Sequence, residues 1–199
     1  MAVRANACPT SPDGSMTGAD DGSTGGATHL ECTKCGTTYD ANRLWRLSPC
    51  CEKPLYPRSD LESIARTFTP DALSGRESTL WRYAEVLPVR DPRYRFSLGE
   101  GMTPLVESAR LGSELGLDRV WIKDEGRNPT ASFKARGLAM AVTMAKHFGI
   151  TRIAMPTNGN AGAALAAYGS RAGIETIVPF LELTDEQWTR IKSMRWNAE

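Results

Sequence analysis

The sequence has no apolar run near the roughly 18 residues that a membrane-spanning helix needs. It also has no excess of charge of either sign, because its 24 basic and 23 acidic side chains give a formal net charge of +1. Nucleic-acid backbones select a concentrated positive face, so this balance argues against nucleic acid as a partner. We therefore expect a soluble globular protein that neither spans a membrane nor binds nucleic acid.

The N-terminus lacks the basic start and apolar core of a secretory signal, which favours a cytoplasmic location. Residues 1–28 are mainly glycine, serine, threonine and aspartate. They offer almost nothing to bury, so we expect a disordered tail. No internal repeat and no sustained heptad pattern is present. We expect a cysteine-bearing segment at 29–57 and a partial α/β domain at 58–199.

Four of the five cysteines lie close together between residues 29 and 57. Cys32 and Cys35 have the two-residue spacing that lets two thiolates bind one tetrahedral metal ion. Cys50 and Cys51 are adjacent, and side chains that are adjacent on an extended chain point in opposite directions, so both seldom bind one ion. The pattern predicts a zinc-ribbon-like segment with a structural zinc. A three-ligand or distorted site, and a reduced hairpin without metal, are the alternatives.

From residue 58 onward, short apolar strands alternate with helical stretches. This β-α-β-α-β order is typical of an open, mostly parallel sheet with flanking helices. Ligands of such sheets bind in the loops that follow the carboxyl ends of the strands, and here those loops are "EGRNPTAS" and "TNGNAG". The expected strands are 119–125, 152–156 and 174–180, and the expected helices are 132–148 and 160–172.

The first of these loops leads directly to Lys134. Asn128 and Pro129 end the preceding strand, and Thr130 or Ser132 can cap the helix, which should begin near residue 132. A lysine in the first turn is disfavoured as a cation by about 0.3–1 kcal/mol. The same placement suits a neutral amine that attacks an aldehyde, beside N–H groups that attract phosphate or carboxylate. A surface lysine with a small, screened cost is the alternative.

The second loop turns through Asn158, Gly159 and Asn160 into a helix that has alanine or glycine at nearly every early position. Small residues let the backbone lie close to a flat ligand, and the first N–H groups of the helix can bind a carboxylate. Tight packing of an alanine-rich helix on a sheet explains the alanines without any ligand. It does not explain the Asn-Gly-Asn turn.

Three motifs occur in order behind the cysteines: "SLGEGMTPL" (97–105), "NPTASFKARG" (128–137) and "TNGNAGAALAAY" (157–168). With them the sequence resembles the fold-type II pyridoxal-phosphate enzymes, and among these the threonine synthases. The resemblance covers about residues 30–180. It implies pyridoxal 5′-phosphate as cofactor, an amino acid as substrate, and lyase chemistry that converts O-phosphohomoserine and water to threonine and phosphate. It favours the aldehyde-binding role for Lys134.

The resemblance also implies roles for single residues. Lys134 would bind the cofactor covalently and then act as acid and base. Phe133 would pack beside the cofactor, and Asn160 would hydrogen-bond the pyridoxal 3′-oxygen. The residues implied to contact the substrate, chiefly its α-carboxylate, are Asn158, Gly159, Ala161, Gly162, Thr130 and Ser132.

The sequence departs from the family pattern at three positions. Ala131 replaces a common glycine, Ala135 a common aspartate and Met102 a common asparagine. Relatives that deaminate serine or threonine share the S-x-F-K-x-R-G core, so a dehydratase-like enzyme is an alternative. A noncatalytic binding module is another.

Family members continue further, with a glycine-rich loop for the cofactor phosphate and a late serine or threonine that faces the pyridine nitrogen. Neither feature is found in the 199 residues of this sequence. We therefore expect weak or no turnover by this chain alone, because a misplaced ring can cost about a hundredfold in rate. An oligomer of identical chains is left open.

Overall fold

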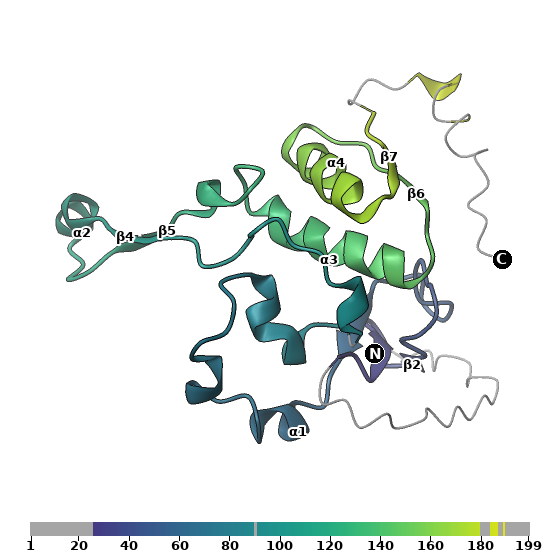
Figure 1. Cartoon of the computed structure of the whole chain (residues 1–199), viewed down its shortest axis with the longest axis horizontal. Helices are drawn as coiled ribbons and strands as arrows, with labels where there is room; N and C mark the ends of the chain where they lie inside the picture. The colour runs from purple at the N-terminus through teal and green to yellow at the C-terminus, as the bar shows by residue number, and fades with distance from the viewer. Residues whose placement is uncertain (1–25, 90, 180–183, 187–188, 190–199) are drawn as a thin grey trace, which may run out of the picture. The chain divides into compact units, whose positions relative to one another are not determined.

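The structure, a computed structural model, describes residues 26–89, 91–179, 184–186 and 189. The chain divides into two compact units, residues 1–75 with 83–90 and residues 76–82 with 91–199. The cysteine-bearing segment predicted at 29–57 lies in the first of these units, together with residues 58–75 and 83–90. Figure 1 follows the chain through both units.

The first unit is built on a three-stranded antiparallel sheet. Its central strand, β1 (His29–Cys32), lies between β2 (Thr38–Tyr39) and β3 (Leu55–Arg58). Arg58 donates two hydrogen bonds, of 2.8 and 3.0 Å, to the carboxylate of Glu31 across β1 and β3. These contacts join strands that lie more than twenty residues apart in sequence.

The folded part of this unit begins before residue 29. The N–H of Thr28 donates to the carbonyl of Arg58 at 2.6 Å, and the N–H of Gly26 donates to the carbonyl of Glu85 at 3.3 Å. Gly26 and Thr28, which were expected in the N-terminal tail, thus make backbone hydrogen bonds within this unit. The rest of the predicted tail, residues 1–25, lies outside the described residues.

Short helical segments complete the first unit and lead out of it. In α1 (Leu61–Ala65) the carboxylate of Asp60 caps the helix by accepting the N–H of Ser63 at 2.9 Å. A single turn, η1 (Asp71–Leu73), follows. The longer η2 (Leu80–Val86) crosses the division between the units, where the backbone at Tyr83 is not helical.

The second unit contains two separate pairs of strands. In one, β4 (Leu105–Glu107) pairs antiparallel with β5 (Trp121–Lys123), and α2 (Ala109–Leu115) lies between them in the chain. In the other, β6 (Arg152–Ala154) pairs parallel with β7 (Glu175–Ile177).

The α/β class is confirmed, but the expected single, mostly parallel sheet is wrong for the described residues. The strand predicted at 119–125 pairs antiparallel with β4, the strand before it in the chain, and not with the parallel strands β6 and β7. The predicted strands at 152–156 and 174–180 do pair in parallel. Residues 180–183, 187, 188 and 190–199, at the end of the predicted α/β domain, lie outside the described residues.

The strands β4 and β5 expose apolar side chains. Both strands are exposed along their whole length, with large hydrophobic residues that are 47–57% exposed. Figure 1 draws this pair and α2 extending away from the two long helices. These exposed residues are Leu105, Val106, Trp121 and Ile122.

No helix among the described residues is long and apolar enough to cross a bilayer.

The core of the second unit lies where α3 (Lys134–His147) packs against α4 (Asn160–Ala172), with β6 and β7 beside them (Figure 1). Small side chains let the two helices approach closely. The helix predicted at 160–172 is confirmed, and the one predicted at 132–148 begins two residues later. The buried core residues are Ala135, Ala139, Val142, Ala145, Ala164, Leu165, Tyr168, Ala172 and Ile174.

Two glycines of α4 are required by close packing. A Cβ at Gly169 would clash with Cγ2 of Thr176 on β7, and one at Gly162 would clash with Thr157 and Val178. In contrast, a Cβ at Gly137 on α3 would meet nothing within 4 Å. The glycine residues of α4 therefore set how closely the helix lies on β6 and β7.

We expect Gly169→Ala to destabilise the second unit by roughly 1–3 kcal/mol, because the methyl group must displace the side chain of Thr176 on β7. Gly137→Ala is the matched control and should stabilise the helix by about 0.5–1 kcal/mol, since alanine is the better helix former in open space. Urea unfolding followed by circular dichroism measures both. Equal effects of the two substitutions would show that α4 is not packed as described.

Candidate functional site

Lys134 is the first residue of α3, and its ammonium nitrogen lies 4.4 Å from the centre of the Phe133 ring. Phe133 is 58% exposed, so the pair lies at the surface of this unit. The N–H groups of Ala135 and Arg136 already close the first turn by donating to the carbonyls of Ser132 and Phe133, at 3.3 and 3.2 Å. The predicted placement of Lys134 in the first turn is confirmed.

The predicted helix cap is wrong. No side chain caps α3, and the hydroxyl oxygens of Thr130 and Ser132 have no hydrogen-bond partner among the described residues. The Oδ1 atom of Asn128 is buried without a partner there as well. An unpaired buried polar atom costs about 1–3 kcal/mol. The loop before Lys134 thus holds three polar oxygens that a polar ligand could satisfy.

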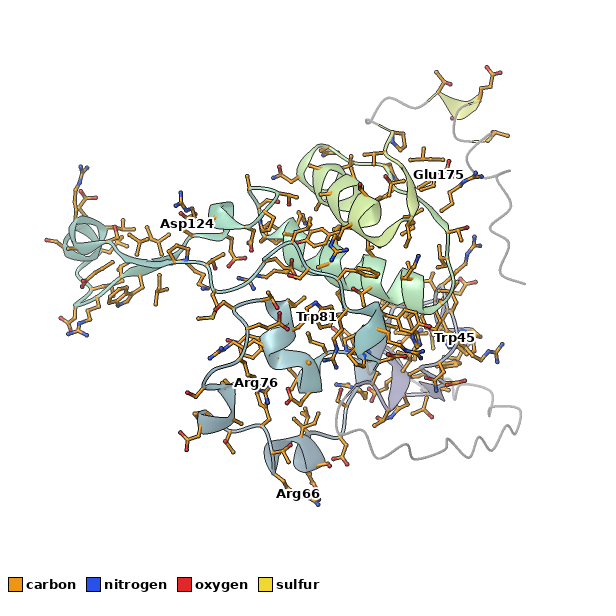
Figure 2. All side chains as sticks on the ribbon, in the orientation of Figure 1. Trp45, Arg66, Arg76, Trp81, Asp124 and Glu175 are labelled. Atoms are coloured by element: carbon orange, nitrogen blue, oxygen red, sulfur yellow. The ribbon has the colours of Figure 1, made fainter. Side chains whose placement is uncertain are left out.

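A network of hydrogen bonds fixes this loop to the start of α3. Glu125, in the turn η4 (Glu125–Arg127), accepts hydrogen bonds of 2.7 and 2.8 Å from Arg136. It also accepts one of 2.6 Å from the hydroxyl of Thr103 and one of 2.9 Å from the side-chain amide of Asn128. Figure 2 shows the neighbouring Asp124 at this turn, between β5 and α3.

The environment of Glu125 keeps its carboxylate ionised. Hydrogen bonds from Arg136, and then from Thr103 and Asn128, lower the pKa of Glu125 from 4.5 to about 2, against the opposing effect of burial. Arg136 lies two residues after Lys134 on the same helix. The ion pair therefore ties the position of Lys134 to the turn that precedes it.

At the second loop, Thr157 organises the start of α4. Its buried hydroxyl accepts the N–H groups of Gly159 at 3.1 Å and Gly162 at 3.0 Å. Gly159, the residue before the helix, has φ +139°, a conformation that side chains with Cβ rarely adopt. The Asn-Gly-Asn turn is thus a cap built around a threonine hydroxyl.

Because of this cap, only some of the predicted substrate contacts still have a backbone N–H group that can donate to a substrate. The N–H groups of Gly159 and Gly162 are taken by Thr157, and Gly162 is needed for packing. The N–H groups of Asn158, Asn160 and Ala161 have no recorded partner within the described part of the chain. Asn158 and Asn160 are exposed. In Figure 1 both α3 and α4 begin on the left of the view.

Two of the departures from the family pattern lie where the backbone is left-handed. Ala131 has φ +53° and Met102 has φ +39°. Glycine and asparagine tolerate this conformation better than other residues, which accounts physically for their use at these two positions. The third departure, Ala135, is fully buried in the helix core.

The cysteine cluster lies in the first unit. The four sulfur atoms of Cys32, Cys35, Cys50 and Cys51 all lie within 4.8 Å of one another, and those of Cys35 and Cys50 are 3.3 Å apart. Tetrahedral zinc with Zn–S bonds of about 2.3 Å holds its sulfurs roughly 3.8 Å apart. The cluster therefore has the dimensions and the donor set of a four-cysteine zinc site.

The adjacency of Cys50 and Cys51 is not an obstacle to a common site. The N–H groups of Cys51 and Glu52 donate to the carbonyl of Ser48, at 3.4 and 2.8 Å, so the chain turns here and is not extended. The expectation that the two side chains point apart is wrong because it assumed an extended backbone. The turn directs both thiols towards Cys32.

Neighbouring hydroxyl groups support the thiols. Cys32 donates to the hydroxyl oxygen of Ser48 at 3.2 Å, and the sulfur of Cys35 lies 3.1 Å from the hydroxyl of Thr37. Hydrogen bonds from Thr37 lower the pKa of the Cys35 thiol, whereas burial raises the pKa of Cys51. Metal binding requires thiolates, so it would release protons from this cluster.

The family of pyridoxal-phosphate dependent enzymes matches the chain over residues 96–198, slightly more than half of its length. The matched region contains all of the second loop, Lys134 and the Glu125 network. The chain therefore belongs to this family, whose cofactor is pyridoxal phosphate.

Several curated relatives of the chain are threonine synthases. The chain is 41% identical to that of Methanocaldococcus jannaschii over 148 residues, which is 74% of this chain and 36% of the relative. It is 37% identical to that of Methanosarcina acetivorans over 151 residues, 75% of this chain and 36% of the relative. It is 48% identical to that of Halalkalibacterium halodurans over 99 residues, 50% of this chain and 28% of the relative. The chain thus spans about a third of the length of these relatives.

Sequence reasoning did not single out Thr157, Glu125 or Arg136 as parts of the site. A signal for Thr157 was available, because a threonine followed by a glycine-bearing turn and a helix is a capping pattern. Glu125 and Arg136 lie eleven residues apart, and nothing in a single sequence pairs them. Only the three-dimensional structure shows that they pair.

We expect Glu125→Gln to destabilise the second unit by roughly 1–2 kcal/mol near neutral pH, because charge-assisted hydrogen bonds are lost from a partly exposed site. The folded-state pKa of about 2 lies below the ordinary 4.5. The contribution of Glu125 is therefore present above the ordinary value and is lost as the pH falls towards 2. Denaturant unfolding at several pH values measures this.

Glu114→Gln is the control, because Glu114 pairs with Arg110 at 2.9 Å on the exposed face of α2. An exposed pair of this spacing contributes only about 0.3–0.5 kcal/mol. Two outcomes would contradict the role given to the Glu125 network. One is a loss of unfolding free energy in Glu125→Gln no larger than in this control, and the other is a loss that stays constant as the pH falls.

Proposed function

We propose that this chain carries the lysine-bearing part of a threonine synthase-like, pyridoxal-phosphate dependent lyase that acts on O-phosphohomoserine. The observation that carries the proposal is the start of α3. There Lys134 follows a loop with three buried oxygens that are unpaired among the described residues, and the ion pair of Glu125 and Arg136 holds this loop in place. The threonine synthases named above, which align with up to 75% of this chain, support the same assignment.

The residues present fit the cofactor. Pyridoxal phosphate, when bound, supplies a conjugated ring that accepts electrons from the substrate. Lys134 is the amine that would hold its aldehyde carbon and then carry a proton during the reaction. Asn160 would donate to the ring oxygen, as the resemblance implies. The unpaired hydroxyl groups of Thr130 and Ser132 would contact the substrate.

The start of α4 would bind the substrate's α-carboxylate. The N–H groups of Asn158, Asn160 and Ala161, which have no partner in the part of the chain that the structure describes, favour an anion there. The positive end of the helix dipole favours it as well. Thr157 would keep these groups oriented by occupying the N–H groups of Gly159 and Gly162. The protein's contribution is therefore to orient cofactor and substrate with backbone groups that need no rearrangement.

Two alternatives stay distinct from this proposal. A dehydratase-like enzyme would release ammonia from serine or threonine, whereas the proposed lyase releases phosphate from O-phosphohomoserine. A noncatalytic binding module would release neither and would form no covalent adduct with the cofactor. Parallel assays of ammonia, phosphate and cofactor attachment separate all three.

Lys134→Ala should abolish covalent attachment of pyridoxal phosphate and leave the fold largely intact. Lys134 is a half-buried first-turn residue that adds little to the core. The measurement is borohydride reduction of the chain mixed with the cofactor, followed by peptide mass spectrometry. Wild-type chain should carry the reduced adduct at Lys134.

Lys146→Ala serves as the control, because Lys146 lies in the last turn of the same helix. This substitution should not reduce the adduct at Lys134. Finding the adduct on Lys123 or Lys146 in the wild-type chain, or on no lysine at all, would refute the proposed role of this helix start.

We further propose that the four clustered cysteines bind one structural zinc. Four sulfurs leave no open position for a substrate, so such a metal would stabilise the fold and take no part in the reaction. The cysteines lie at the end of β1 and in two turns beside a short three-stranded sheet, a segment with few buried residues. A metal would therefore contribute a large share of the stability of this segment.

Purified protein should hold about one zinc per chain, and Cys32→Ser should release it and loosen residues 30–57. Elemental analysis in reducing, chelator-free buffer measures the metal, and limited proteolysis measures the loosening. Cys8→Ser is the control, since Cys8 is the one cysteine of the sequence that the proposed site does not use, and the zinc content should stay unchanged. A wild-type chain without zinc would refute the metal site.

A further inference from the structure

The turn formed by residues 97–103 contains a carboxyl group that is completely buried. Glu100 is 0% exposed. One of its oxygens, Oε2, accepts hydrogen bonds from the hydroxyl of Ser97 at 3.2 Å, the N–H of Leu98 at 3.0 Å and the hydroxyl of Tyr168 at 2.6 Å. Tyr168 is also 0% exposed and belongs to α4. The carboxyl group thus joins the turn to this helix.

The same turn is joined to the other helix three residues later. The hydroxyl of Thr103 accepts a hydrogen bond of 3.1 Å from Arg136 of α3 and donates one of 2.6 Å to Glu125. A single short segment therefore holds both long helices, one through Glu100 and one through Thr103. These are the helices that begin with Lys134 and Asn160.

The turn has little freedom to move. The N–H of Leu80 donates to the carbonyl of Glu100 at 2.8 Å. Gly101 has φ +135°, and a Cβ there would lie 2.8 Å from the carbonyl carbon of Thr79. A rigid segment transmits a displacement of one attached helix to the other, because close-packed interiors have few alternative arrangements.

Core stability alone does not account for Glu100. Its second oxygen, Oε1, is buried with no hydrogen-bond partner among the described residues. Burying a carboxyl group with an unpaired oxygen is costly, and an apolar pair of similar volume would fill the same space without that cost. What the carboxyl group adds is a directional link from the turn to Tyr168.

We propose that Glu100 is a positioning residue, which fixes the start of α4 relative to Lys134 through Tyr168. The inference rests on the proposed function, because it assumes that Lys134 and the α4 start share one cofactor. Loss of the link would leave both helices folded. It would let the N–H groups at the start of α4 move away from their position relative to Lys134.

The test compares Tyr168→Phe, which removes only one hydroxyl, with Val142→Ala, which weakens the same core from α3 without touching the link. Glu100→Ala removes the link and Glu100→Gln keeps an acceptor oxygen for Tyr168. For each variant, urea unfolding gives the stability, and pyridoxal phosphate titration gives the affinity. The adduct's absorption band and hydrogen exchange at residues 158–163 report on the site itself.

We expect Tyr168→Phe and Glu100→Ala to weaken cofactor binding by roughly tenfold, to shift the absorption band and to speed exchange at 158–163. Glu100→Gln should restore most of the affinity. Val142→Ala should lower stability and leave affinity, band and local exchange near wild type. Val142→Ala and Tyr168→Phe are compared at an equal loss of stability. If Val142→Ala then changes affinity, absorption band and local exchange as much as Tyr168→Phe does, Glu100 is only structural and the proposal is overturned.

Failure of the proposed function gives a different result. If wild-type chain forms no adduct at Lys134, the cofactor assignment fails. The role of the hydrogen bond between Glu100 and Tyr168 is then tested by hydrogen exchange alone. Faster exchange at 158–163 in Tyr168→Phe, with no change in Val142→Ala, would still support a positioning role for Glu100. Unchanged exchange in Tyr168→Phe would overturn it.

Discussion

The close packing of α3 against α4 is the constraint on which the second unit depends. The shared core is mostly alanine, and Gly162 and Gly169 bring α4 onto Thr157, Val178 and Thr176. Because side chains this small leave little space between the elements, few alternative registers would fill the interior equally well. The backbone groups at the helix starts then acquire fixed directions, which is what a ligand-binding loop requires.

Local signals were sufficient for the parts of this arrangement that depend on neighbouring residues. The bounds of α4 follow from its turn and its glycine after Ala172, and the position of Lys134 follows from the loop before it. The cap of α3 was mispredicted, because a hydroxyl that can accept a hydrogen bond need not do so. The hydroxyl oxygens of Thr130 and Ser132 are unpaired within the described residues.

Contacts between distant residues could not be predicted in the same way. The link from Glu100 to Tyr168 spans 68 residues, and the antiparallel partner of β5 lies in a segment with no strong strand pattern. For the cysteines, the error came from treating residues 48–52 as extended. Spacing indicated the donors, but only the turn at Ser48 determined where they point. Single-sequence reasoning is weakest where one hydrogen bond reverses the direction of a side chain.

The exposed strands β4 and β5 have a consequence for the protein in the cell. A two-stranded sheet with half-exposed Leu105, Val106, Trp121 and Ile122 is an unpaired template that other chains can extend. Surfaces of this kind are what chaperones and quality-control proteases recognise. The cellular lifetime of the free chain would therefore depend on how quickly this surface is covered, in addition to the stability of its core.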